Sequence, residues 1–143
     1  MSKSNAFETA VLGLLFNATP IPNVADNAAS APLTDLYISA HTSDPGEAGN
    51  QQSNEATYSS YARVAVARSG SGFTVAGDTV TFAADVVFPE ATGGAETITH
   101  AGIGSLSSGA GVLYYSGTVS PNITVATGVA PTVKATGSTI VES

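Results

Sequence analysis

The chain has 143 residues, of which 10% are charged and 43% are hydrophobic. This composition fits one domain, or one domain with an arm, and does not fit an intrinsically disordered chain. The absence of cysteine excludes disulfide scaffolds, zinc knuckles, iron–sulfur sites and thiol catalysis.

The charge balance is acidic, with 4 Lys and Arg residues against 11 Asp and Glu, for a net charge of −7. The cations Lys3, Arg63, Arg68 and Lys134 are scattered from end to end, whereas an electrostatic nucleic-acid binder needs several cations to neutralise phosphates. We therefore expect no direct nucleic-acid partner and no membrane partner. Because no apolar stretch approaches roughly 20 residues and Ala10–Phe16 lacks the flanks of a signal peptide, we expect a soluble, unprocessed chain.

The N-terminal segment predicts the only helix, from Asn5 to Ala18, with Asn5 as its cap and Glu8 at capping-box spacing. Pro20 and Pro22 end this helix. It is apolar nearly all round, so it must be buried, either in its own core or against another chain, and both alternatives stay open. The residues expected to contact another subunit in this region are Phe7, Val11, Leu12, Leu15, Phe16 and Ile21.

The rest of the chain has the pattern of an all-β fold. After a small-residue linker, 23–32, short β-branched and aromatic runs recur between clusters of Gly, Pro, Asn and Ser. We expect a β-sandwich or jelly-roll-like domain over residues 33–143, preceded by the helix and an extended arm over residues 1–32. The expected strands are Leu33–His41, Ser60–Arg68, Phe73–Val75, Thr79–Ala83, Ala84–Phe88, Glu96–Ser105, Val112–Val119, Asn122–Ala126, Pro131–Ala135 and Ser138–Glu142.

One long polar loop, Thr42–Thr57, interrupts these strands. Loops of this length in a small domain are usually functional or disordered. Its oxygen-bearing side chains suit Ca²⁺, but their spacing does not match an EF-hand, so a solvated acidic loop is favoured and no metal site is predicted. These side chains are Asp44, Glu47, Asn50 and Glu55.

No motif predicts catalysis or a cofactor. His41 and His100 lie in or beside expected strands. Serine is so abundant that a Ser-His-Asp triad assembled from the sequence alone carries no information. Gly102 and Gly104 lack the third glycine and the helix of a dinucleotide fingerprint, so they favour a β-hairpin. A glycan hydrolase built on Glu90 and Glu96 has no spacing argument behind it. We therefore predict no catalytic residues and no cofactor.

The aromatic residues divide into two groups. Phe73, Phe82, Phe88, Tyr114 and Tyr115 lie on expected strands and are assigned to the core. Tyrosine and arginine are favoured anchors at buried interfaces. The second group, expected at an interface, follows the polar loop and consists of Tyr58 and Tyr61 together with Arg63.

The run Leu36–Glu47, which reads LYISAHTSDPGE, resembles an LY-x-x-LHT-x-DPG signature of small tailed-bacteriophage virion proteins. Members of that family are often labelled tail-fibre-like, but the structurally more persuasive comparison is with capsid cement or decoration proteins. The latter are β-sandwich or jelly-roll proteins that sit as dimers or trimers over the major capsid protein lattice. Later segments extend the resemblance in order, namely Asn54–Tyr58, Tyr61–Arg63, Val87–Pro89, Thr97–Gly104, Leu113–Gly117 and the tail Asn122–Glu142.

The resemblance implies a non-enzymatic phage virion structural protein made in the host bacterial cytoplasm. Its expected place is the exterior of the capsid, where it would stabilise the head as a cement protein. The expected partners are the major capsid protein and further copies of the same chain, as a homodimer or homotrimer. The alternative is a tail-fibre or tail-tip protein involved in host attachment.

Overall fold

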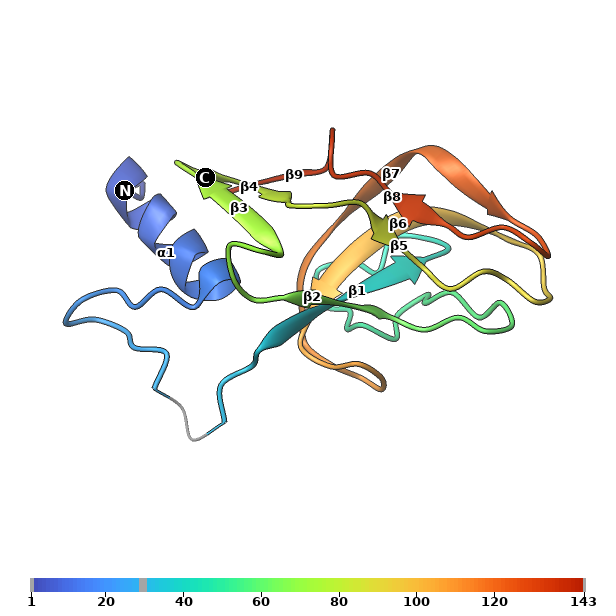
Figure 1. The fold of residues 1–143 in the computed structure, drawn as a ribbon, viewed down its shortest axis with the longest axis horizontal. Helices are drawn as coiled ribbons and strands as arrows, with labels where there is room; N and C mark the ends of the chain where they lie inside the picture. Colours follow the sequence, from blue (N-terminus) through green and yellow to red (C-terminus); the bar gives the residue numbers. More distant parts are fainter. Residues whose placement is uncertain (1, 29–30, 143) are drawn as a thin grey trace. The chain divides into compact units, whose positions relative to one another are not determined.

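The computed structural model describes residues 2–28 and 31–142 and confirms an all-β fold with one short helix (Figure 1). The paired strands in five of its β-ladders run antiparallel, as in β1 with β6 and β3 with β4. No helix among the described residues is long and apolar enough to cross a membrane. The elements in chain order are α1 (Asn5–Asn17), β1 (Asp35–His41), β2 (Val64–Ala67), β3 (Phe73–Ala76), β4 (Thr79–Phe82), β5 (Val86–Val87), β6 (Glu96–Gly104), β7 (Leu113–Val125), β8 (Thr132–Val133) and β9 (Thr139–Val141).

The chain forms two compact units. The helical unit comprises the described residues up to Asp35, together with Val66–Asp85 and the segment from Lys134 onward. The main-sheet unit comprises Leu36–Ala65 and Val86–Val133. Residues from the middle and the end of the chain thus join the helix in one unit, and a domain boundary between residues 32 and 33 stays a prediction.

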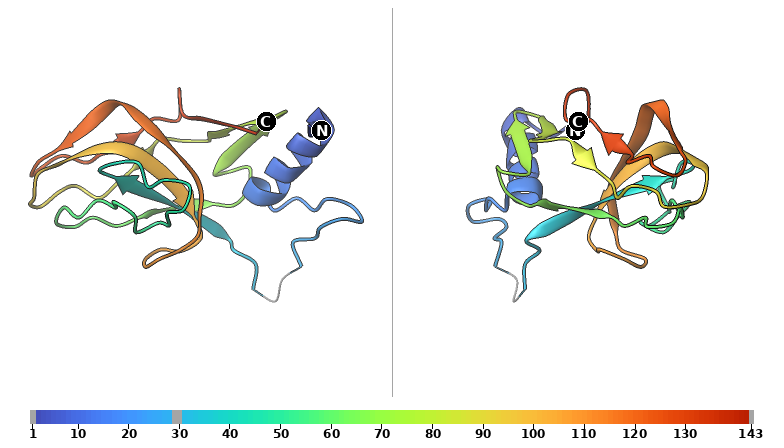
Figure 2. Two further views of the ribbon diagram at one scale, coloured as in Figure 1. Left: turned by 180° about the vertical axis from the view of Figure 1, so that it is seen from behind. Right: turned by 45° about the vertical axis from the view of Figure 1, so that its right-hand side comes forward.

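The helical unit packs α1 on the sheet β3-β4-β9, and both views in Figure 2 show the helix alongside β3. Leu12 and Phe16 are fully buried, and the ring of Phe16 meets that of Phe73 edge-on at a centroid distance of 5.0 Å. The helix is thus part of the core of its own unit. Its N-cap is Ser4, whose hydroxyl accepts from the amide of Phe7, so the cap expected at Asn5 is one residue too late.

Arg68 fastens the arm that follows the helix. Its guanidinium donates to the carbonyl oxygens of Leu14 and Leu15 at 2.6 and 2.7 Å, where the last turn of α1 leaves its acceptors unpaired. The same group donates to Asn27 Oδ1 at 2.7 Å and to the Leu33 carbonyl at 3.2 Å. A cation at a helix C-terminus also interacts favourably with the helix dipole. The Arg68 side chain therefore connects the C-terminal end of α1 to Asn27, within the arm, and to Leu33, just after it.

The main-sheet unit holds β6, β7, nearly all of β1 and the first two residues of β2, which pair in a sheet with the order β2-β1-β6-β7. β6 and β7 pair antiparallel, which confirms the hairpin expected around Gly102 and Gly104. The two strands expected at Val112–Val119 and Asn122–Ala126 are one strand of 13 residues. Pro121 does not end it because it lies at a register shift, between Thr118 and Ile123, on the last strand of the sheet, and a residue without an N–H is tolerated at such a place.

Both faces of β1 are covered in the main-sheet unit. Leu36, Ile38 and Ala40 form the apolar face, at 0–1% exposure. Ser39 and His41, on the opposite face, are equally inaccessible, so alternation in the sequence does not here separate core from solvent. Tyr114, which was expected in the core, is 36% exposed because the described part of this strand is largely uncovered.

Candidate functional site

The polar loop after β1 is a folded structure, in which Asp44 and Glu47 are exposed to solvent and Glu55 is half-buried. It leaves the strand at Thr42 and returns beside it, with the Thr42 amide donating to the Asn54 carbonyl at 2.9 Å and the Ala56 amide to the Ala40 carbonyl at 2.8 Å. Inside the loop, Asp44 Oδ1 accepts from the Gly46 amide at 2.8 Å. We call residues 42–57 the braced loop.

His41 connects the braced loop to the sheet. Its Nδ1 lies 2.8 Å from the carbonyl oxygen of Ser53, and its Nε2 lies 2.8 Å from the hydroxyl of Ser39. A carbonyl oxygen can only accept, so Nδ1 carries the proton and the neutral ring accepts from Ser39 through Nε2. Burial lowers the pKa of His41, which favours this neutral form.

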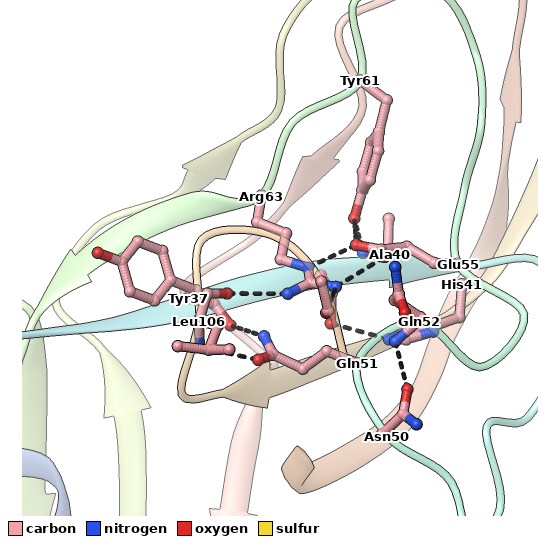
Figure 3. A network of polar contacts seen from close by, with 12 residues as sticks. Tyr37, Ala40, His41, Asn50, Gln51, Gln52, Glu55, Tyr61, Arg63 and Leu106 are labelled. Carbon is pink, nitrogen blue, oxygen red and sulfur yellow. Dashed lines mark hydrogen bonds and ion pairs between the residues drawn. The ribbon is translucent and has the colours of Figure 1, made fainter. Parts of the chain in front are cut away.

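Gln51 is a fully buried side chain that joins three segments (Figure 3). Its Oε1 accepts from the amide of Leu106 at 2.9 Å, and its Nε2 donates to the Tyr37 carbonyl at 3.3 Å. The backbone N–H of Gln51 donates to the carbonyl of Gly111 at 3.0 Å. Through Gln51, the braced loop and β1 are bonded to the turn at residues 105–111, which connects β6 to β7.

Glycines on β6 and in the turn make room for this contact. A Cβ at Gly104 would lie 2.2 Å from Gln51 Cδ, and one at Gly111 would lie 2.0 Å from Gln51 Oε1. The glycine pattern that was tested against a nucleotide fingerprint thus has a steric cause, namely the close approach of a buried amide.

Glu55 lies between Tyr61 and Arg63, as Figure 3 shows. Arg63 donates from Nε to Glu55 Oε1 at 2.6 Å and from Nη2 to Oε2 at 2.8 Å, a two-point ion pair. The Tyr61 hydroxyl donates to the same Oε1 at 2.9 Å and accepts from the Ala40 amide at 3.0 Å. The carboxylate therefore has three donors from two side chains.

The same guanidinium also holds the turn at residues 105–111. Arg63 Nη1 donates to the Leu106 carbonyl at 2.9 Å, and Nη2 donates to the Gly109 carbonyl at 2.7 Å. Arg63 and Gln51 thus fix the backbone of the turn from inside the unit. The side chains of Leu106 and Val112 remain 47% and 60% exposed.

The ionisation states follow from these contacts. The hydrogen bonds to Glu55 raise the pKa of Arg63, so its guanidinium is charged at neutral pH. Burial raises the pKa of Tyr58 to about 12 and also raises the pKa of Tyr61, so both hydroxyls stay protonated.

Glu96 has a structural role at the end of the braced loop. Its Oε1 accepts from the amides of Thr57 and Tyr58 at 3.0 and 3.1 Å. The Tyr58 hydroxyl in turn donates to the carbonyl of Pro89 at 3.0 Å. The carboxylate considered for glycoside hydrolysis is thus occupied by backbone donors.

The network as a whole is internally satisfied. Among the described residues, every buried side-chain nitrogen or oxygen has a hydrogen-bond partner, and no three His, Cys, Asp or Glu side chains form a metal-binding group. Ser39 and His41 form a serine–histidine contact, but both are at 0% exposure, and a backbone carbonyl takes the place of the orienting carboxylate of a triad. The arrangement fixes the loop and the turn as a rigid scaffold.

The residues expected at an interface fall in both units. In the helical unit Phe7 is 44% exposed, whereas Leu12 and Phe16 are in the core; Val11, Leu15 and Ile21 are half-buried. In the main-sheet unit the rings of Tyr58 and Tyr61 meet at 5.4 Å, and Tyr58 and Arg63 are only 3% and 9% exposed. Contact with a partner stays a prediction for these residues, and Phe7 is the most accessible of them.

Sequence reasoning did not identify Gln51 or Arg68. Gln51 stands in a polar run that includes Gln52 and Asn50, so residue type alone does not distinguish the buried amide from exposed ones. The glycines of β6 and the turn carried the available signal, because glycine in a strand often marks close approach of another group.

Comparison with known proteins gives one family. Residues 2–141 match the family described as Podophage GP4 fiber I protein gp80. The comparison with curated proteins gave no significant match.

Proposed function

Because this chain belongs to the family of the podophage GP4 fiber I protein gp80, and is therefore a bacteriophage virion structural protein, we propose that it is a non-enzymatic component of a virion fibre. The observation that carries the proposal is the extent of the match. It runs from residue 2 to residue 141 and so includes both compact units. The fibre role was the alternative in the sequence analysis, and the family description favours it over capsid cement.

The geometry supports a scaffold role. The two-point Arg63–Glu55 pair and the buried Gln51 fix a loop and a turn whose outer side chains are exposed. A surface that is rigid before it binds loses less conformational entropy on association. Such a surface suits permanent assembly into a particle, and its buried polar groups are already occupied by one another.

Cryo-electron microscopy of purified virions tests the fibre role. Side-chain-resolved density for both units in fibres attached to the tail is the expected result. Quantitative mass spectrometry of separated heads and tails provides an independent measurement, in which the chain should follow the tail fraction. Recovery of the chain only with DNA-filled heads would contradict the fibre role.

The second candidate is a cement protein on the exterior of the capsid, with the major capsid protein as its partner. It is supported by the resemblance carried by Leu36–Glu47 and the segments that follow. Repeated weak contacts across a lattice would be sufficient for binding, because multivalent engagement raises avidity. Density at the lattice symmetry axes of the head would establish this role in the same experiment.

A further inference from the structure

We propose that the outer face of α1 is a docking surface for a different virion protein, which covers it with an amphipathic helix whose apolar side is bordered by lysine or arginine. The proposal rests on the membership of this chain in a family of virion proteins and applies equally to a fibre and to the head. It concerns the helical unit alone.

α1 buries one face and leaves a second apolar face outside. Its buried residues recur every four positions around Leu12, and the sheet β3-β4-β9 lies on one side of the helix (Figure 1). At about 100° per residue, the side opposite Leu12 carries three apolar residues. Phe7 is 44% exposed and the other two are half-buried. We call these residues the outer stripe: Phe7, Ala10 and Leu14.

The outer stripe lacks the charged neighbours that normally face solvent. Glu8 is the only charged residue of α1, and it is buried. From Thr9 to Ala25 the sequence has no Asp, Glu, Lys or Arg. A surface helix usually carries charged residues opposite its core, whereas a helix that is hydrophobic all round is buried. α1 therefore has the composition of a helix covered on two sides, and the described part of the helical unit packs its sheet on one.

The cations of the helical unit are already engaged within it. Lys3 pairs with Glu142, and Lys134 pairs with Asp85. Arg68 donates to oxygens at the end of α1, in the arm and just after it. The charge that this unit offers to a partner outside these contacts is therefore negative.

Two exposed carboxylates lie near the two ends of the outer stripe. Asp78 is in the turn between β3 and β4, which accepts a hydrogen bond from the Thr9 hydroxyl at 2.8 Å. Asp26 is in the arm, which Arg68 joins to the carbonyl of Leu14. A complementary surface therefore has apolar side chains at its centre and cations toward its ends.

A basic amphipathic helix has these properties. Apolar side chains three, four and seven positions apart are the usual anchors in recognition through a helix face. Opposite charges beside such anchors steer the encounter and fix its orientation. A second copy of this chain does not fit, because it would bring Asp26 and Asp78 toward further carboxylates, and each copy has a net charge of −7.

Photo-cross-linking in assembled virions tests the proposal. Phe7→p-benzoylphenylalanine places a cross-linker in the outer stripe, and mass spectrometry identifies the peptides that it captures. We expect one segment of another virion protein, with lysine or arginine around apolar residues at helical spacing. Val87→p-benzoylphenylalanine is the matched control, since Val87 is 54% exposed in the main-sheet unit, and it should not capture that segment.

The captured peptide decides the outcome. Cross-links from position 7 only to this chain, only to segments without lysine or arginine, or to nothing in virions that contain the variant overturn the proposal. Capture of a head protein with the expected sequence pattern would contradict the fibre role and still support this docking surface.

A peptide probe tests the same surface on the full chain in solution. A labelled amphipathic helix of leucine and lysine, about as long as α1, should bind, and its leucine–glutamate counterpart should not. The double variant Asp26→Asn, Asp78→Asn should weaken binding about ten-fold at low salt. The double variant Asp44→Asn, Glu47→Gln has the same net charge and should bind as the parent does. Equal losses in the two double variants, or binding that Phe7→Ser leaves unchanged, overturn the proposal.

Discussion

Arg63 and Glu55 form a two-point ion pair in which Nε lies 2.6 Å from Oε1 and Nη2 lies 2.8 Å from Oε2. The Arg63 side chain is only 2% exposed, and its remaining donors reach the turn between β6 and β7. The pair therefore fixes the position of a turn that is 43 residues away from Arg63 in sequence. Removing either partner leaves the other charged group buried without its counter-ion.

Arg63→Met should lower the free energy of unfolding by about 3–5 kcal/mol, because breaking a buried pair leaves an uncompensated carboxylate. Urea denaturation followed by circular dichroism measures the change. Lys134→Met is the control, since its partner Asp85 lies at the surface and the pair between them contributes little. Equal losses in the two variants would contradict the structural role of Arg63.

Gly104→Ala should destabilise the chain by about 1–3 kcal/mol, because the added methyl group overlaps the Gln51 side chain and displaces it from Leu106. Gly117→Ala is the matched control, since a Cβ at that position meets nothing within 4 Å. Thermal unfolding of the two variants and the parent checks the difference. A stability for Gly104→Ala at or above that of Gly117→Ala would show that Gln51 is not held as described.

His41 should make stability depend on pH in a defined direction. Its pKa in the folded chain is lowered from 6.5, chiefly by burial, so the unfolded chain binds a proton first as the pH falls. The contribution of neutral His41 is fully present above about pH 6.5 and is lost as the pH falls toward the lowered pKa of the folded state.

Unfolding free energies between about pH 7.5 and pH 5.5 should therefore fall more steeply for the parent chain than for His41→Gln. His100→Gln retains His41 and should keep the steeper slope. Identical slopes for the parent and His41→Gln would remove His41 as the cause of the pH dependence.

Phe16→Ala should cost about 3–5 kcal/mol, because it opens a cavity against Phe73 in the helical unit. Phe7→Ala deletes the same side chain from the same helix at a position that is 44% exposed, and it should cost far less. Chemical denaturation separates the two. Similar losses would mean that α1 does not pack on β3 through its buried face.

The long polar loop shows where sequence reasoning stops. Its residue types indicate turns, and Asp44 does form one with Gly46. Its packing, however, depends on His41 reaching Ser53 and on Gln51 reaching Leu106. Glutamine is a polar residue that is usually exposed, so its burial here was not predictable from local sequence.

The interface assignments reached the same limit. Tyr58 and Arg63 were assigned to contacts with a partner because their residue types favour interfaces. In the folded chain Tyr58 donates to Pro89, and Arg63 donates to Glu55 and to the turn at residues 105–111, while contact with a partner stays a prediction. Residue type indicates an amphipathic anchor, but the anchor is equally effective within one chain and between two.

Local patterns in the sequence determined the all-β class, the single N-terminal helix and the β6–β7 hairpin, because turn residues and side-chain periodicity act between near neighbours. Tertiary structure alone decided that the two segments around Pro121 form one strand, that this strand ends the sheet, and that Arg63 and Gln51 brace a distant turn. These features depend on pairings between residues far apart in the chain. Such pairings follow from which surfaces the fold brings together and buries, and no local pattern specifies them.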